Sequence, residues 1–273
     1  GGRCWLRAML SQWSGEERLH ANVLTPVLIS GKQGLSKSTF CRLLMPDSLR
    51  HYFIDNLNLT AGSSPEKKLV KNGLINLDEF DKIKESQQAT LKNLLQMVNV
   101  PVFRGKRLGW VNESRLASFI ATTNVYQVLI DSTGSRRFLC VEVLKPISEE
   151  PLEHKQIYAQ LKEELKSGAP DYLNKEEEKA LQKHNKAYYR QSLLEDVFHC
   201  CFRHPLETEK GIWLTTAEIF QVMRKFTSTA LKEVSARQLG LKLSAMGYMA
   251  KHTSFGNRYY VFNLSAEKKD VSL

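Results

Sequence analysis

The sequence lacks the features of membrane, secreted and disulfide-rich proteins. No apolar run approaches the length that spans a bilayer, and no secretory leader is visible. The five cysteines are scattered and odd in number, and no Cys-x-x-Cys pair accompanies them, which argues against a disulfide framework or a zinc site. We therefore expect a cytoplasmic protein with reduced thiols. Because the chain opens at Gly1-Gly2 without methionine, we also expect a preceding domain.

Acidic residues are missing from two long stretches. The net charge is +10, yet no Asp or Glu occurs from Gln87 to Asn112 or from Val234 to Leu264, whereas Lys and Arg occur in both. A uniformly solvated basic surface would not concentrate its cations in this way. The distribution favours an anionic partner, and it favours nucleic acid over membrane because no basic amphipathic anchor is present.

A glycine is missing at the end of a candidate phosphate-binding loop. Residues 26–39 read PVLISGKQGLSKST, an apolar strand, a loop and a helix that begins near Lys37. In the pattern G-x-x-x-x-G-K-[ST], Ser36 replaces the last glycine and lacks glycine's freedom at positive φ. The simpler alternative is a Gly/Ser-rich turn between a strand and a helix. As a phosphate loop, its backbone and helix start would hold ATP, Lys37 would reach the β- and γ-phosphates, and Ser38 would bind Mg²⁺. The predicted nucleotide-binding residues are Gly31, Gly34, Leu35, Ser36, Lys37, Ser38 and Thr39.

Two later apolar strands end in polar residues that suit the same chemistry. LINLDE at 74–79 places Asp78, which would hold the metal with Ser38, beside Glu79, which would polarise the attacking water. SFIATTN at 118–124 ends in Asn124, whose amide would orient water against the γ-phosphate. Taken singly, these are an acidic strand end and an ordinary strand-terminating Asn. Their order along the chain predicts a nucleotide-hydrolysing core.

A basic turn completes this series. DSTGSRRF at 131–138 presents Arg136 and Arg137 just before the strand FLCVEV. A planar guanidinium neutralises the charge that develops on a transferring phosphoryl group, although a basic surface turn would look the same when taken alone. The two arginines are therefore predicted catalytic residues together with Lys37, Glu79 and Asn124.

In order and spacing, these motifs resemble the virulence-associated protein E family, whose ATPase core is similar to superfamily 3 helicases and phage-type primase-helicases. The resemblance spans roughly residues 5–190 and is carried by GKQGLSKSTF, NLDEFD, LKNLLQMVNVPVFRGKRLGW, SFIATTN and DSTGSRRF, with the helical stretch from IYAQL to KHN less specific. It implies that Arg136 or Arg137 acts across a subunit boundary. A homo-oligomeric ring follows from that implication, with a hexamer as the expected form.

The first acid-free stretch contains a predicted β-hairpin. VPVFRGKRLGW reads as two short strands about a Gly-containing turn with a basic tip. The resembled helicases place such a hairpin between the acidic strand and the sensor strand, pointing into the ring channel. We expect Arg104, Lys106 and Arg107 to follow the phosphates of single-stranded DNA, the alternative being a solvated hairpin. The dispersed tryptophans are predicted to pack in the core rather than to stack on bases: Trp5, Trp13, Trp110 and Trp213.

The second acid-free stretch lies in a predicted winged helix. Three helical segments are followed by a β-ribbon about Gly256-Asn257, with Thr215 or Thr216 capping one helix and Glu218 behind it. A helix in the major groove and a wing over the backbone would use the cations of this stretch on duplex DNA. The alternative is a winged helix that contacts only proteins. The predicted DNA-binding residues are Arg237, Lys242, Lys251 and Arg258.

The predicted fold class is α/β: a P-loop NTPase core, similar to the AAA+ type, with a central, mostly parallel sheet. The predicted domains are the ATPase core at 1–144, a helical bridging subdomain at 145–188 and a winged helix with a basic tail at 189–273. The predicted function is a DNA-stimulated, Mg-ATP-hydrolysing helicase or translocase of a mobile or phage-like element. One alternative is a DNA-binding initiator that uses ATP as an assembly switch. Another is a purely structural partner of a missing primase.

Overall fold

The computed structural model divides the chain into two compact units. It describes residues 1–15, 20–60, 62–130, 135–190, 193–227, 231, 235–254 and 256–264. The units are Gly1–Arg190 and Gln191–Leu273, and each is described by itself. Throughout the described ranges, no helix is both long enough and apolar enough to cross a membrane.

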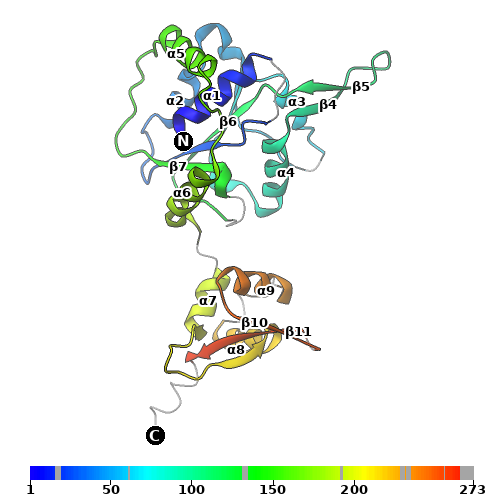
Figure 1. The fold of residues 1–273 in the computed structure, drawn as a ribbon, viewed down its shortest axis with the longest axis vertical. Coiled ribbons are helices and arrows are strands. Elements are labelled where there is room, and N and C mark those ends of the chain that lie inside the picture. Colours follow the sequence, from blue (N-terminus) through cyan, green and yellow to red (C-terminus); the bar gives the residue numbers. More distant parts are fainter. Residues whose placement is uncertain are drawn as a thin grey trace. The chain divides into compact units, whose positions relative to one another are not determined.

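A five-stranded parallel sheet forms the centre of the first unit (Figure 1). The strand order is β2-β3-β6-β1-β7, and each neighbouring pair is parallel. This finding confirms the predicted α/β class and the central parallel sheet. The strands are β1 (Thr25–Ile29), β2 (Phe53–Asp55), β3 (Leu74–Leu77), β6 (Ser118–Thr123) and β7 (Phe138–Glu142).

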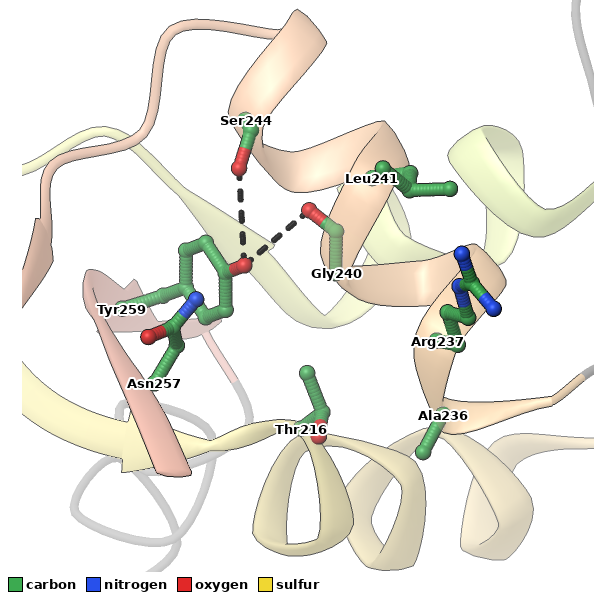
Figure 2. Close-up of a pocket in the computed structure, with 8 residues that line it drawn as sticks. All are labelled: Thr216, Ala236, Arg237, Gly240, Leu241, Ser244, Asn257 and Tyr259. Carbon is green, nitrogen blue, oxygen red and sulfur yellow. Dashed lines mark hydrogen bonds between the residues drawn. The ribbon is translucent and has the colours of Figure 1, made fainter. Parts of the chain in front are cut away.

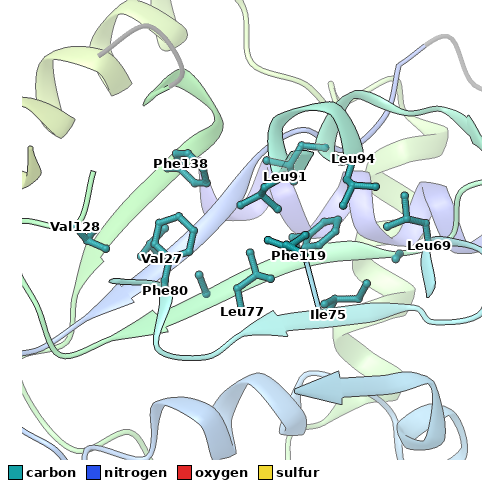
Figure 3. Packing of buried hydrophobic residues seen from close by; sticks show 14 of the residues in the cluster. Val27, Leu69, Ile75, Leu77, Phe80, Leu91, Leu94, Phe119, Val128 and Phe138 are labelled. Atoms are coloured by element: carbon teal, nitrogen blue, oxygen red, sulfur yellow. The ribbon is translucent and has the colours of Figure 1, made fainter. Parts of the chain in front are cut away.

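Helices cover both faces of this sheet, which explains why its inner strands read as continuous apolar runs. Every residue of β1, β3 and β6 is buried. On one face, Leu91 and Leu94 of α4 (Glu85–Gln96) pack in a cluster with Phe119 (Figure 3). On the other face, Met9 of α1 (Gly2–Trp13) packs in a cluster with Ile120. These two clusters pack against the two faces of the sheet whose strand ends carry the candidate site.

The remaining helices of the first unit include those of the predicted bridging segment. That segment lies in the same unit as the sheet, because Glu164 of α5 pairs with Arg7 of α1 at 3.0 Å. Asn185 of α6 also donates a 2.7 Å hydrogen bond to Phe138 O of β7. The elements are α2 (Lys37–Leu43), η1 (Asp47–Tyr52), α3 (Glu66–Leu69), η2 (Phe80–Lys82), η3 (Ser135–Arg137), α5 (His154–Lys166), α6 (Lys175–Asn185) and η4 (Lys186–Tyr188).

A β-hairpin extends from the first unit between α4 and β6 (Figure 1). Its strands, β4 (Asn99–Phe103) and β5 (Trp110–Ser114), are antiparallel, with Phe103 opposite Trp110. Val100 and Val102 are buried in the core cluster that includes α4, whereas the alternate residues of β4 are exposed. The predicted hairpin is confirmed, and the alternation shows which of its faces is turned away from the core.

In its described residues, the second unit combines three helices with a small antiparallel sheet. Strand β11 pairs with β10, β9 and β8. Thr215 caps α8, accepting a 3.2 Å hydrogen bond from Glu218 N while the Glu218 side chain returns to Thr215 N. The predicted cap at Thr215 is confirmed. The predicted ribbon is present as β10 and β11, but Gly256 and Asn257 belong to β11 rather than to the turn, since Gly256 pairs with Thr253; β8 and β9 are additional strands. The elements are α7 (Leu193–Cys201), β8 (Phe202–Arg203), β9 (Ile212–Thr215), α8 (Thr216–Phe226), α9 (Ala236–Ala245), β10 (Ala250–Thr253) and β11 (Gly256–Asn263).

Candidate functional site

The candidate phosphate loop, residues 30–36, joins the carboxyl end of β1 to α2. Gly34 has φ 77° and Ser36 has φ 57°, both in the left-handed region. Ser36 therefore adopts the conformation of the glycine that it replaces in the motif, and α2 begins immediately after it. At Gly31, a Cβ atom would lie 2.9 Å from Cε2 of Tyr126, so any larger residue requires the exposed ring of Tyr126 to shift. The loop meets the backbone requirements that the sequence pattern implies.

Lys37 reaches across the sheet edge to the predicted sensor residue. Its ammonium donates a 2.8 Å hydrogen bond to Asn124 Oδ1 and a second hydrogen bond to Ser30 Oγ. Burial lowers the pKa of Lys37, because the charged form loses hydration, and the nearby Asp78 carboxylate acts in the opposite direction. Among the described residues, the acceptors that contact this buried ammonium, Ser30 and Asn124, are neutral, so the charge of an anionic ligand would compensate it.

Asp78, at the end of β3, meets Ser38 in the first turn of α2. Ser38 Oγ donates a 3.3 Å hydrogen bond to Asp78 Oδ1, and Thr122 Oγ1 of β6 donates to the same oxygen. Carboxylate and hydroxyl oxygens are the protein ligands that Mg²⁺ prefers, usually one or two of them beside water and phosphate. Ser38 and Asp78 therefore fit a magnesium site, and Thr122 holds the carboxylate in place. Thr122 is in β6, the strand next to β3, and the sequence alone does not indicate its contact with Asp78.

Glu79 is directed away from the group formed by Lys37, Ser38 and Asp78. Its φ is 51°, and its exposed carboxylate accepts a 2.6 Å hydrogen bond from Lys82 Nζ. Another acid is directed toward the sensor strand instead: Asp81 accepts a 2.6 Å hydrogen bond from Thr123 Oγ1. Sequence reasoning did not single out Asp81, although it follows in the same acidic segment. Two carboxylates are thus available near the strand ends, in different environments.

Arg136 and Arg137 precede the amino end of β7, whereas the loop follows the carboxyl end of β1. Residues Thr25–Ile29 of β1 run parallel to Phe138–Glu142 of β7, so the arginines precede the level at which β1 begins. A five-residue strand spans roughly 13–17 Å, which separates the backbone of both arginines from the carboxyl strand ends. Arg136 forms an ion pair of 3.6 Å with Glu178 of α6. The Gly turn at 131–134 lies outside the described residues.

The predicted cations of the hairpin have different environments. The guanidinium of Arg104 binds Glu113 on the facing strand, with Nη2 and Oε2 2.6 Å apart. This pairing lowers the pKa of Glu113, and it occupies Arg104. Lys106 and Arg107 are exposed in the loop between Gly105 and Gly109, both of which have positive φ.

The predicted cations of the second unit also divide into two groups. Lys242 of α9 is half-buried and donates a 2.6 Å hydrogen bond to Glu195 of α7. Arg237 is exposed and lines a pocket of about 330 Å³ between α9 and β11, where Tyr259 donates to Gly240 O (Figure 2). Lys251 and Arg258 are cross-strand partners in β10 and β11. Lys242 is therefore engaged in an ion pair within the unit, which is a structural role distinct from the predicted DNA contact.

Two family profiles match the chain. A profile described as the virulence-associated protein E-like domain matches residues 21–190, and a domain of unknown function from a B. Theta gene description (DUF3874) matches residues 191–261. No curated protein sequence matches. The apo structure of the NrS-1 C-terminal region (305–718) matches at 14% identity and a TM-score of 0.42, over 96% of this chain and 70% of that one. An A form apo structure of that region matches at 17% identity and a TM-score of 0.42, over 91% and 58%.

Proposed function

The chain belongs to the virulence-associated protein E-like family, and we propose that its first unit binds and hydrolyses Mg-ATP. The observation that carries this proposal is the convergence of Lys37, Ser38, Asp78 and Asn124. Lys37 and Ser38 begin α2, which follows β1 through the loop, whereas Asp78 and Asn124 come directly after β3 and β6; these three strands are adjacent in one parallel sheet. The carboxyl edge of such a sheet is where α/β proteins bind their ligands.

Each member of this group has a role that follows from its chemistry. Lys37 exchanges its contacts with Ser30 and Asn124 for phosphate oxygens, and the backbone of residues 31–39 surrounds the phosphates. Ser38 and Asp78 hold Mg²⁺, which, when bound, neutralises phosphate charge. Once released by Lys37, the Asn124 amide orients the attacking water.

The water must lose a proton to a carboxylate. Glu79 is the proposed general base, which requires it to leave Lys82. Asp81 is the competing candidate because its contact with Thr123 places it beside the sensor strand. Comparison of Glu79→Gln with Asp81→Asn separates them: the base is the residue whose amide variant binds ATP but does not hydrolyse it.

Arg136 and Arg137 act on a neighbouring subunit in this proposal. Their backbone lies about a strand length away from the loop of their own chain, and a second copy would bring them to a phosphate site. A homo-oligomeric ring, expected to be hexameric, satisfies this geometry. Mixing Lys37→Ala with Arg137→Ala subunits would then restore part of the ATP hydrolysis that each variant lacks alone, because mixed interfaces contain one complete site.

The proposed output is movement along DNA, or remodelling of DNA, during replication of a mobile or phage-like element. Support comes from the exposed Lys106 and Arg107 of the hairpin, and from the basic second unit, for which we propose a winged helix that binds duplex DNA. The proposal for the element itself rests on the family.

Steady-state ATP hydrolysis with and without single-stranded DNA tests this function. We expect turnover that rises with DNA and is lost in Lys37→Ala. Lys71→Ala, which removes an exposed lysine outside the site, is the control and should retain activity. Turnover that is indifferent to single-stranded DNA would overturn the motor function. Hydrolysis that survives in Lys37→Ala would overturn the site.

The second candidate function is a DNA-binding initiator that uses ATP as an assembly switch. The ion pair of Glu79 with Lys82 favours it, because the proposed base is held away from the other site residues. In a switch, Glu79→Gln leaves DNA loading intact. In a helicase, the same variant traps ATP and abolishes unwinding.

A further inference from the structure

One face of the hairpin carries aromatic side chains that the core leaves exposed. Trp110 is 72% exposed and Phe103 is 47% exposed. Their rings are cross-strand neighbours with centroids 5.6 Å apart, tilted by 56°. The prediction that all four tryptophans pack in the core therefore fails for Trp110 and also for Trp213, which is 39% exposed, whereas Trp5 is buried at 3%.

The rest of this face is uncharged. Strand pairing places Asn99 opposite Ser114 and Pro101 opposite Asn112, so these residues share the outer face with the aromatic pair. The one acid of the hairpin strands, Glu113, is opposite the core-facing Val100 and is held by Arg104. The outer face thus joins an aromatic surface to the cations of the adjacent loop, Lys106 and Arg107, without an acid between them.

We propose that this face binds single-stranded nucleic acid by stacking bases on Trp110 and Phe103 while Lys106 and Arg107 hold the phosphates. Aromatic surfaces beside cations bind single strands because every base has a π-face, and a duplex keeps its base faces stacked inside. This proposal rests on the DNA partner of the proposed function. It adds the aromatic pair as the feature that selects single-stranded over duplex DNA. A second copy of the chain is the competing occupant, but two cations at the tip favour an anionic partner.

The test is equilibrium binding of a fluorescent oligothymidylate of about 20 nucleotides, and of a duplex of that length, to the full chain without nucleotide. Trp110→Ala should weaken single-strand binding about tenfold and leave duplex binding unchanged. Trp110→Phe should recover most of the loss, because a ring remains. Lys106→Ala should instead reduce the dependence of binding on salt concentration.

Leu108→Ala is the matched control. Leu108 is 66% exposed in the same loop and has no ring, so its loss should change single-strand affinity less than about twofold. Equal losses in Leu108→Ala and Trp110→Ala would show non-specific apolar contact and overturn the proposal. Unchanged single-strand affinity in Trp110→Ala would overturn it too, and a change in sedimentation of that variant would then assign the face to subunit contact.

Intrinsic fluorescence gives an independent readout. Stacking on an exposed indole quenches it, so oligothymidylate should quench the wild type more than Trp110→Phe. Because these measurements use no nucleotide, their failure is distinct from failure of ATP hydrolysis. One result would separate the two proposals: the wild type hydrolyses no ATP, yet Trp110→Ala binds single strands more weakly than the wild type. This result would overturn the ATPase and support the stacking face.

Discussion

The hydroxyl of Ser36 donates a 2.6 Å hydrogen bond to Oε1 of Glu149, which joins the candidate phosphate loop to the segment that follows β7. In the same segment, Ile147 N donates to Leu35 O at 3.2 Å. A non-glycine residue in the left-handed region costs about 1–2 kcal/mol, so the contact offsets part of the strain at Ser36. It also places a carboxylate beside a loop proposed to hold anionic phosphates.

Glu149→Gln should therefore tighten Mg-ATP binding. An amide can still accept the hydrogen bond of Ser36, but it removes roughly 1 kcal/mol of repulsion, which corresponds to about fivefold in the dissociation constant. Glu150→Gln is the matched control, since it removes the same charge one residue further from this contact. Calorimetric titration with Mg-ATP measures both. Equal effects of the two variants would mean that overall charge, rather than the contact with Ser36, determines the affinity.

Arg115→Ala should destabilise the first unit. The side chain is 3% exposed, and its guanidinium donates to Leu94 O at 3.0 Å, Leu95 O at 2.8 Å and Asn22 O at 3.1 Å. Alanine leaves these buried carbonyls without their donor, so the free energy of unfolding should fall by about 3 kcal/mol. Urea unfolding followed by circular dichroism measures this change.

An exposed arginine provides the control for that experiment. Arg107→Ala removes the same charge from the hairpin loop and should change the free energy of unfolding by less than about 0.5 kcal/mol. Similar losses in the two variants would show that charge, rather than the buried hydrogen bonds of Arg115, accounts for the effect.

Glu209 should make the stability of the second unit depend on acid. The Arg203 guanidinium, with Nη2 2.7 Å from Oε1, and the backbone N–H of Leu206 lower the pKa of Glu209 from 4.5 to about 2. A depressed folded pKa stabilises the unit above the unfolded value, and this contribution is lost as pH falls from about 4.5 to about 2. Glu209→Gln should therefore lower the melting temperature near neutral pH, and the difference from wild type should shrink as pH falls through this window. Glu207→Gln, an exposed neighbour, should show no such convergence.

Lys242 and Arg237 should respond differently to removal. Arg237→Ala should weaken duplex DNA binding about fivefold and reduce its salt slope by about one, because an exposed phosphate contact is lost. Lys242→Ala should leave affinity within about twofold and cost less than about 1 kcal/mol of stability, because the lysine already pairs with Glu195. Fluorescence anisotropy at several salt concentrations measures the DNA terms. A larger affinity loss in Lys242→Ala would show that DNA displaces Glu195.

The ends of the sheet strands could be predicted because each one is marked in the local sequence by a change from apolar to polar residues. Continuous apolar runs that stop at Ser30, Asp78 and Asn124 indicate buried parallel strands, and the carboxyl ends of such strands meet at one edge. The caps at Thr215 and Ser235 are equally local, since each lies three residues from its Gln or Glu partner. The contacts of Asp78 with Thr122 and of Asp81 with Thr123 could not be predicted, because they depend on the register of strands far apart in the chain.

By itself, the sequence determined the α/β class, the family and the residues available at the sheet edge, since hydrophobic pattern and motif spacing are properties of neighbours along the chain. Tertiary structure alone decided how those residues are used. It buried Arg115 and exposed Trp110, it paired Arg104 and Lys242 with acids, and it turned Glu79 toward Lys82. The physical reason is that burial and ion pairing depend on distances in space, and strand register and helix packing set these distances over separations that no local pattern encodes.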